Sequence, residues 1–282
     1  MHEIKPGQSI ALLKELHILT RDGKMNQDSR RKLKQINHLV HFIEPLLNDV
    51  LGSQNAVSLV DHGAGKSYLG FLLYDLFFKS RDDASHIYGI ETRAELVARS
   101  TQLARDLAFE RMSFLHLSVA ESIDSNSLPE QVDVVTALHA CNTATDDAIR
   151  FAIGKQARFI VVVPCCQAEV AKVLRKNKGA ESTRDPLTEL WRHPLHTREF
   201  GSQVTNVLRC LQLEAHGYQV SVTELVGWEH SMKNELITAS YQDLPRRRPA
   251  ERLREVLAKL GLEEMETRFF VPLDARQAGA SV

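Results

Sequence analysis

A glycine-rich segment after a short apolar run contains residue types that could bind a nucleotide-like ligand. In residues 57–69, VSLVDHGAGKSYL, the apolar run ends at Asp61, and Gly63 and Gly65 precede an apolar helical pattern. Glycine permits a tight turn and lets a ligand approach the backbone where a Cβ would clash. The first turn of a helix also offers unpaired N–H groups. The segment therefore predicts a strand, a turn and a helix that together form a ligand site.

Three classes of ligand compete for this loop. A phosphate-binding P-loop requires a glycine five residues before Gly65, where this chain has Val60. A dinucleotide loop requires a third glycine three residues after the second, where this chain has Tyr68. S-adenosylmethionine (SAM) has no pyrophosphate for the loop to bind. A strand that ends in an acidic residue and is followed by Gly-x-Gly favours SAM, and this chain has Asp61 before Gly63 and Gly65. A tight turn without a ligand is the alternative.

A second acidic residue supports the SAM interpretation. Glu91 ends the next apolar run, thirty positions after Asp61. A carboxylate at the tip of the second strand can accept both ribose hydroxyls of an adenosine. Residues after the third strand are candidates for the adenine. The expected cofactor-binding residues are Asp61, Gly63, Ala64, Gly65, Tyr68, Glu91, Ser118, Val119 and Leu138.

The elements that position these residues alternate between strands and helices. Strands are expected at residues 57–60, 87–90, 112–117, 132–138 and 159–163, and helices at 67–79, 94–108, 144–153, 168–177, 201–216 and 249–260. Such alternation predicts a parallel sheet covered by helices. Two further strands, at 218–226 and 235–241, are too close for a helical crossover and should be antiparallel. A loop is expected at 177–194 and a short terminal strand at 268–271.

The sequence pattern divides the chain into three parts. Residues 1–54 are expected to form an N-terminal helical extension, because apolar residues recur at helical spacing over 31–47. Residues 55–245 form the α/β domain, and residues 246–282 a basic helix and a C-terminal tail. The extension is a possible substrate-binding element.

Three motifs resemble one methyltransferase family. Residues 61–69 resemble its D-x-G-A-G-K-G-x-L loop, residues 138–146 its L-H-x-C-x-x-x-T/S-D segment, and residues 164–166 its P-C-C segment. This is the family catalogued as methyltransferase domain thirty-two, and it is similar to the acceptor-stem 2′-O-methyltransferases of tRNA. Where the family commonly has glycine this chain has Ser67 and Asn142, and Gln167 stands where the tRNA enzymes have a histidine.

The resemblance implies a fold and a cofactor. The fold is a Rossmann-like class I methyltransferase, an α/β protein with a seven-stranded, mostly parallel sheet and an antiparallel last strand. The cofactor is SAM. The substrate implied is structured RNA, either tRNA or rRNA. A small-molecule or protein methyltransferase, and a SAM-binding RNA-associated protein without turnover, are the alternatives.

The candidate catalytic residues are His139, Cys141, Cys165 and Cys166, which follow the fourth and fifth strands. Ligands of parallel α/β sheets gather outside the carboxyl ends of the strands, so these side chains should face the transferred methyl group. His139 could act as a general base or orient the substrate. The cysteines could supply a thiolate that adds to cytosine C5, bind zinc with a histidine, or pack the pocket floor as small buried residues. No metal is predicted.

Composition excludes a disordered chain and a bulk polycation. The 282 residues contain 35 Lys and Arg and 36 Asp and Glu, with 43% hydrophobic residues. Three local basic clusters nevertheless lie within residues 21–34, 172–178 and 246–254. Solvated helix faces would explain each alone, but three beside a methyltransferase domain fit an RNA partner better. The candidate RNA contacts are Arg30, Arg31, Lys32, Lys34, Lys172, Arg175, Lys176, Arg246, Arg247 and Arg248.

Nothing in the sequence points to secretion or to a membrane. The N-terminus lacks the pattern of a signal peptide, and no apolar run approaches the ~20 residues that span a bilayer. Four cysteines, two of them adjacent, are too few for a secreted disulfide framework. We therefore expect a reduced, cytoplasmic protein without a membrane partner. The sequence does not predict its oligomeric state.

Overall fold

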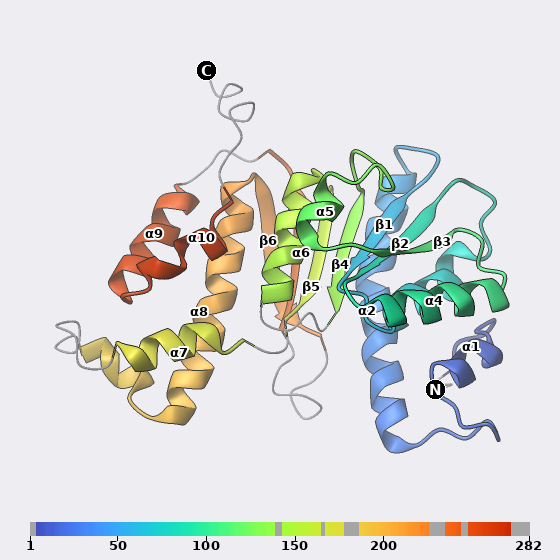
Figure 1. Ribbon diagram of the computed structural model, residues 1–282, viewed down its shortest axis with the longest axis horizontal. Coiled ribbons are helices and arrows are strands. Elements are labelled where there is room, and N and C mark those ends of the chain that lie inside the picture. Colours follow the sequence, from blue (N-terminus) through green and yellow to red (C-terminus); the bar gives the residue numbers. More distant parts are fainter. Residues whose placement is uncertain are drawn as a thin grey trace.

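The computed structural model describes residues 4–138, 143–164, 167–177, 186–225, 235–243 and 248–271. Its centre is a seven-stranded sheet in the order β3-β2-β1-β4-β5-β7-β6, with helices on both faces (Figure 1). The strands are β1 Ser58–His62, β2 His86–Glu91, β3 Met112–His116, β4 Val134–Leu138, β5 Phe159–Val163, β6 Tyr218–Glu224 and β7 Glu235–Tyr241.

The sheet has the topology that the sequence predicts for a class I methyltransferase. Strands β1 to β5 pair with one another in parallel, and β7 runs antiparallel to both β5 and β6. The connection between β6 and β7 is too short for a helical crossover, which is why this pair is antiparallel. The prediction of a mostly parallel sheet with an antiparallel last strand is confirmed.

The helices are α1 Ile10–Glu15, α2 Gln27–Leu51, α3 Tyr68–Leu73, α4 Ala94–Asp106, α5 Val119–Ile123, α6 Thr143–Gly154, α7 Glu169–Lys176, α8 Pro194–Ala215, α9 Pro249–Lys259 and α10 Glu266–Phe269. A π-helical turn, Tyr74–Phe78, continues α3, and 3-10 turns occupy Pro186–Trp191 and Glu263–Met265. Among these described helices, none is both long and apolar enough to cross a membrane.

The N-terminal extension shares its hydrophobic core with the sheet. Helix α2 buries a stripe of apolar side chains at helical spacing, among them Leu33, Ile36 and Ile43. This stripe joins side chains of α1, α3 and β1 in one cluster. Burial of apolar surface stabilises a contact by roughly 25 cal/mol per Å². The buried stripe therefore holds α2 against the α/β domain. The basic first turns of α2 are therefore carried on a rigid support.

Two other clusters complete the core. One lies on the opposite face of the sheet, where α6 packs, and includes Tyr218 at the start of β6. A smaller cluster joins α7, α8 and α9, with Phe269 of α10 fully buried in it. In Figure 1 these three helices extend beyond the β5 side of the sheet, at the far end of the molecule from α1 and α4.

Some local predictions were wrong. Residues 266–269 form the helical turn α10, where a strand is expected at 268–271, because Phe269 packs among helices and the Phe270 N–H donates to the Glu266 carbonyl at 2.9 Å. Helix α8 begins at Pro194, earlier than predicted, and the expected loop at 177–194 contains a 3-10 turn. Helix α5 was not predicted.

Candidate cofactor and substrate site

The glycine loop after β1 has the backbone shape that its sequence predicts. Gly63 and Gly65 have φ values of 69° and 59°, in the left-handed region that glycine adopts without steric cost. The Ala64 N–H donates to the Ile90 carbonyl at 2.9 Å, and the Gly65 N–H donates to Glu91 Oε2 at 2.8 Å. These bonds tie the loop after β1 to the end of β2, so the two acidic elements of the predicted cofactor site lie together.

Asp61 is a buried carboxyl without a cationic partner in the described part of the chain. Its Oδ1 accepts a hydrogen bond from Thr136 Oγ1 at 3.0 Å, and its Oδ2 accepts a long one from Ser67 Oγ at 3.5 Å. Burial raises the pKa of Asp61 to about 7, and the two hydroxyl hydrogen bonds only partly oppose this. A nearby positive charge would therefore favour the ionised form.

Glu91 is held as an anion at the tip of β2. Its Oε1 accepts from the Arg93 N–H at 3.1 Å and from Arg93 Nε at 2.9 Å, and its Oε2 also accepts from Arg93 Nη2 at 3.1 Å. Burial disfavours the charge, but the hydrogen bonds from Arg93 and Gly65 outweigh it and lower the pKa of Glu91. The Arg93 side chain is 59% exposed, so it can move aside for a ribose. Sequence reasoning missed Arg93.

These residues fit SAM. The loop presents backbone without side chains at Gly63 and Gly65, Asp61 offers a buried carboxyl toward a cationic ligand, and Glu91 offers an anionic acceptor. The remaining predicted residues lie along the same edge of the sheet. Ser118 caps α5 through a capping box with Glu121, Val119 begins α5, and Leu138 ends β4.

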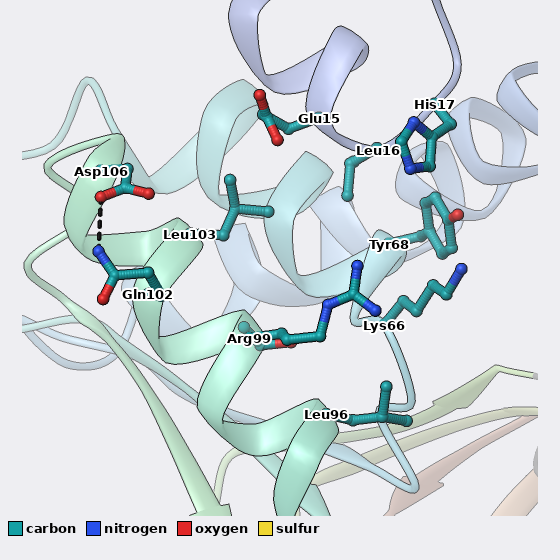
Figure 2. Close-up of a pocket in the computed structure, with 11 residues that line it drawn as sticks. Glu15, Leu16, His17, Lys66, Tyr68, Leu96, Arg99, Gln102, Leu103 and Asp106 are labelled. Carbon is teal, nitrogen blue, oxygen red and sulfur yellow. Dashed lines mark hydrogen bonds between the residues drawn. The ribbon is translucent and has the colours of Figure 1, made fainter.

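Tyr68 lies between the glycine loop and the N-terminal extension. It is the first residue of α3, and Lys32 Nζ of α2 sits 3.0 Å from the centroid of its ring. The ring also lines a pocket shared with α1 and α4 (Figure 2). Tyr68 is therefore a predicted cofactor residue that contacts the basic part of α2.

The predicted catalytic residues His139, Cys141, Cys165 and Cys166 lie outside the described residues. The strands that precede them are described, and Leu138 at the end of β4 pairs with Val163 near the end of β5. The zinc interpretation of these cysteines is untested. Within the described residues no group of three metal-ligating side chains occurs.

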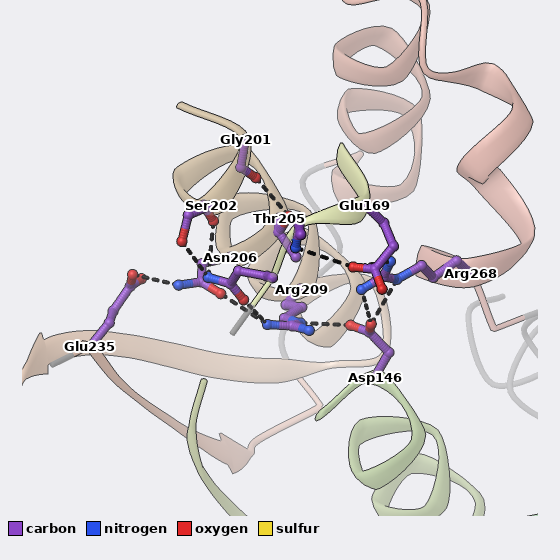
Figure 3. Close-up of polar contacts among 11 residues, drawn as sticks. Asp146, Glu169, Gly201, Ser202, Thr205, Asn206, Arg209, Glu235 and Arg268 are labelled. Carbon is purple, nitrogen blue, oxygen red and sulfur yellow. Dashed lines mark hydrogen bonds and ion pairs between the residues drawn. The ribbon is translucent and has the colours of Figure 1, made fainter. Parts of the chain in front are cut away.

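A buried polar network braces the segments after β4 and β5, and sequence reasoning did not find its central residue. Arg209 of α8 is fully buried. Its Nε donates to Asp146 Oδ1 at 2.6 Å, and its Nη1 donates to Gln167 Oε1 at 2.5 Å and Asn206 Oδ1 at 3.1 Å (Figure 3). Arg268 Nε donates to the other carboxylate oxygen of Asp146 at 2.8 Å.

Two partners of this network carried a weak sequence signal. Asp146 belongs to the motif that follows the fourth strand, and Gln167 stands at the position of the histidine in the tRNA enzymes. Gln167 Nε2 also donates to Ser202 Oγ at 2.8 Å. These side chains therefore connect α6, α8 and Gln167 after β5 in one polar network.

Two further titratable groups lie close to these elements. His62 is buried against Phe151, with ring centroids 5.3 Å apart, and within the described residues neither ring nitrogen has a hydrogen-bond partner. Burial lowers its pKa to about 4, against the opposing charge of Glu91, so the ring is neutral. Burial, with the charges of Glu235 and Glu214, raises the pKa of Cys210 to about 12, which excludes it as a thiolate nucleophile.

The basic clusters lie in different places relative to this edge. In Figure 1, α2 extends beyond the carboxyl ends of the parallel strands, and α7 follows β5 at the same edge. Arg30, Arg31 and Lys34 of α2 are exposed, as are Lys172, Arg175 and Lys176 of α7. The third cluster follows β7, which ends at the opposite edge beside Phe159. Arg248 there forms an ion pair with Glu251, and Arg246 and Arg247 lie outside the described residues.

Comparison with known proteins gives a family match. A family model described as a methyltransferase domain matches residues 31–173, about half of the chain. "Glutathione S-transferase C-terminal domain-containing protein" from Mus musculus is 23% identical over 235 residues, and its namesake from Bos taurus is 23% identical over 242 residues. Each match covers 77% of this chain and 34% of the relative. The chain thus spans about a third of the length of these curated relatives.

Similar solved structures include an rRNA methylase from Streptococcus thermophilus, with a TM-score of 0.42 and 12% identity, covering 72% of this chain and 96% of that one. Magnesium protoporphyrin IX methyltransferase from Synechocystis, solved with bound SAH, has a TM-score of 0.46 and 16% identity. That match covers 83% of this chain and 96% of the other.

Proposed function

This chain belongs to the methyltransferase-domain family and is a SAM-dependent methyltransferase, and on that premise we propose that its substrate is a structured RNA such as tRNA or rRNA. SAM supplies an electrophilic methyl group when it is bound. The residues that would hold it are the backbone of the glycine loop, Asp61 and Glu91. The RNA assignment depends on the surface around this site.

The basic N-terminal part of α2 is the observation that carries the proposal. Arg30, Arg31, Lys32 and Lys34 lie on the part of the helix that extends past the carboxyl edge of the sheet (Figure 1). Contacts between Lys or Arg and phosphates supply most of the sequence-independent affinity for nucleic acids. Because buried leucine and isoleucine side chains hold this helix, these charges keep a fixed position beside the cofactor loop.

Helix α7 supports the same proposal. Lys172 and Arg175 are exposed, and the ion pair of Lys176 with Glu264 is long, at 3.7 Å, and exposed. Exposed pairs of this kind contribute about 1 kcal/mol or less, so Lys176 remains available to a phosphate. The proposal rests on α2 and α7 and not on Arg248, since that residue follows a strand that ends at the opposite edge.

The catalytic roles in this proposal come from the sequence. His139 would accept the proton that the RNA acceptor group loses, or orient that group. Cys141, Cys165 and Cys166 would line the pocket floor or supply a thiolate. The network around Arg209 supports these roles, because it anchors the residues that flank both segments.

Transfer of radiolabelled methyl from SAM to fractionated cell extract tests the substrate class. The extract should come from cells that lack this protein, so that its sites are unmethylated, and RNA, protein and small molecules should be assayed separately. We expect label in RNA, with nuclease mapping to locate the nucleotide. A Gly63→Val variant, which cannot easily adopt the left-handed φ of 69°, is the inactive control. Label confined to protein or small molecules would refute the RNA assignment.

A further inference from the structure

A pocket beside the glycine loop is divided by charge. It has a volume of about 270 Å³ and lies between α1, the start of α3 and α4. Figure 2 shows His17, Lys66 and Arg99 near the ring of Tyr68 at one end, with Glu15 and Asp106 away from them. One end of the pocket is therefore basic.

The cations at this end lack carboxylate partners. Within the described residues, neither Lys66 nor Arg99 forms an ion pair, whereas Asp106 at the far end accepts a hydrogen bond from Gln102 Nε2 at 2.7 Å. Lys32 of α2 does not line the pocket, but its Nζ lies 3.0 Å from the centroid of the Tyr68 ring, which does. Burial and the charge of Lys66 lower the pKa of Lys32 to about 8. The like charges thus repel one another, and an anion between them would relieve that repulsion.

The donor set suits a phosphate group. An arginine guanidinium can donate two parallel hydrogen bonds to phosphate oxygens, while a lysine acts as a mobile point charge. Arg99 points toward Lys66 and Tyr68 in Figure 2. Lys32 lies beside the pocket, against Tyr68, and also belongs to the basic N-terminal part of α2, so the pocket adjoins the surface on which the RNA proposal rests.

We propose that this pocket binds one phosphodiester of the substrate RNA through Lys66 and Arg99, and that Lys32, beside the Tyr68 ring, contacts the same phosphodiester. The inference rests on the proposed function and adds to it a defined contact. Since Lys66 directly follows Gly65, a phosphate fixed here sets the register between the RNA strand and the cofactor loop. His17 and Tyr68 complete the wall of the pocket.

Salt-dependent RNA binding by matched variants tests this site. The variants are Arg99→Gln, Lys32→Gln and their combination. Arg105→Gln is the control, because it removes an exposed charge from the same helix outside the pocket. The probe is bulk tRNA labelled at its 3′ end, with binding followed by fluorescence anisotropy between 50 and 200 mM salt. SAM affinity is measured separately by calorimetry, and folding by thermal melting.

Each pocket variant should remove one phosphate contact. The slope of log K against log salt should fall by about 1 per variant, and affinity at 0.1 M salt should fall about eightfold, the equivalent of 0.9 log units. Because both side chains contact the same phosphate, the double variant should lose little more slope than either single variant. Arg105→Gln should bind RNA nearly as the wild type does, and SAM affinity should stay unchanged in all variants.

Three results would overturn the pocket assignment, and a fourth would refute the function on which it rests. If the wild type binds and methylates RNA and both pocket variants bind it equally well, only the pocket assignment is wrong. If the variants lose SAM affinity instead, the pocket serves the cofactor. If RNA binding is unaffected, but the wild-type protein binds inorganic phosphate in calorimetry and the pocket variants do not, the ligand of the pocket is a free phosphate. Wild-type protein that neither binds nor methylates RNA refutes the proposed function itself.

Discussion

Removal of the negative charge from Asp146 tests whether the buried network holds the site together. In Asp146→Asn the remaining amide oxygen can still accept from Arg209 Nε, but the new NH₂ group faces the donors of Arg268. The guanidinium of Arg209 then stays buried, and the acceptors named here, the new amide at position 146 and the side chains of Gln167 and Asn206, would offer it amide oxygens in place of a carboxylate. Arg268 is better placed, because its Nη1 also lies 3.3 Å from Glu169 Oε2.

The magnitude follows from the burial of the pair. The side chains of Arg209 and Asp146 are 0% and 4% exposed, with Nε and Oδ1 2.6 Å apart. Breaking a buried pair by removing one partner costs about 3–5 kcal/mol, since an uncompensated charge remains. Because Arg209 keeps Gln167 and Asn206 as acceptors, we expect the lower end, about 3 kcal/mol. For a domain of this size that corresponds to a fall in Tm of roughly 6–12 °C.

Asp49→Asn is the matched control. Asp49 Oδ2 lies 2.7 Å from Arg158 Nη2, almost the same separation, but the two side chains are 55% and 41% exposed. Such a pair contributes about 0–1 kcal/mol. Urea unfolding followed by circular dichroism gives both free energies by linear extrapolation. If the two variants lose the same free energy within about 1 kcal/mol, burial of the Asp146 pair does not decide its contribution, and the reasoning is refuted.

Three further predictions concern the elements around the glycine loop. Asp61 has a pKa of about 7 in the folded protein against 3.8 ordinarily, so its contribution to stability is present below pH 3.8 and is lost as the pH rises through 7. Asp61→Asn should therefore raise the free energy of unfolding relative to wild type more at pH 8 than at pH 5, while weakening SAM binding in calorimetry; an equal change at both pH values would contradict this. His62 has a pKa of about 4 against 6.5 ordinarily, so its contribution is present above pH 6.5 and is lost as the pH falls toward 4. His62→Leu should gain about 2 kcal/mol relative to wild type between pH 7.5 and pH 5, measured by urea unfolding, and a pH-independent difference would exclude this role. Ser67 has a φ of 49°, which costs a non-glycine residue about 1–2 kcal/mol, so Ser67→Gly should raise Tm slightly and Ser67→Ala should lower it; a fall in both would refute the strain argument.

The geometry of Ser67 also explains a feature of the sequence. The family resemblance marks this position as one where glycine is common, and the sequence alone shows only that serine replaces it. The structure shows a left-handed residue at the start of α3, where glycine costs least. The serine hydroxyl in turn lies 3.5 Å from Asp61 Oδ2. Backbone strain is thus offset in part by a contact to the buried carboxyl.

The sequence predicted elements that depend on local patterns. The strand at 159–163 was predicted to the residue because five consecutive apolar side chains lie between turn-forming segments. The pairing of the glycine loop with Glu91 was predictable because neighbouring parallel strands end at one edge. The prediction of a strand at 268–271 was wrong because a buried Phe269 fits a strand or a helical turn equally well. Packing against α8 and α9 decides between the two conformations.

The Arg209 network and the basic pocket could not be predicted in the same way. Arg209 meets Asp146 across 63 positions of sequence and Gln167 across 42. In the sequence, Arg209 is one of several charged residues of an amphipathic helix. The neighbouring residues give no signal that its side chain is fully buried. The pocket likewise requires that α1 pack near α4, which brings His17 and Arg99 together. Both features are products of tertiary structure alone.

Two buried aspartates near the carboxyl ends of adjacent strands differ in their partners. Asp61, after β1, meets only hydroxyl groups among the described residues, and its pKa is raised. Asp146, beyond β4, meets two guanidinium groups. A carboxyl whose charge is uncompensated can gain from a cationic ligand, whereas one already paired twice cannot. The first is therefore the predicted cofactor contact, and the second is an internal brace. Substitutions at the two positions should therefore separate cofactor binding from stability.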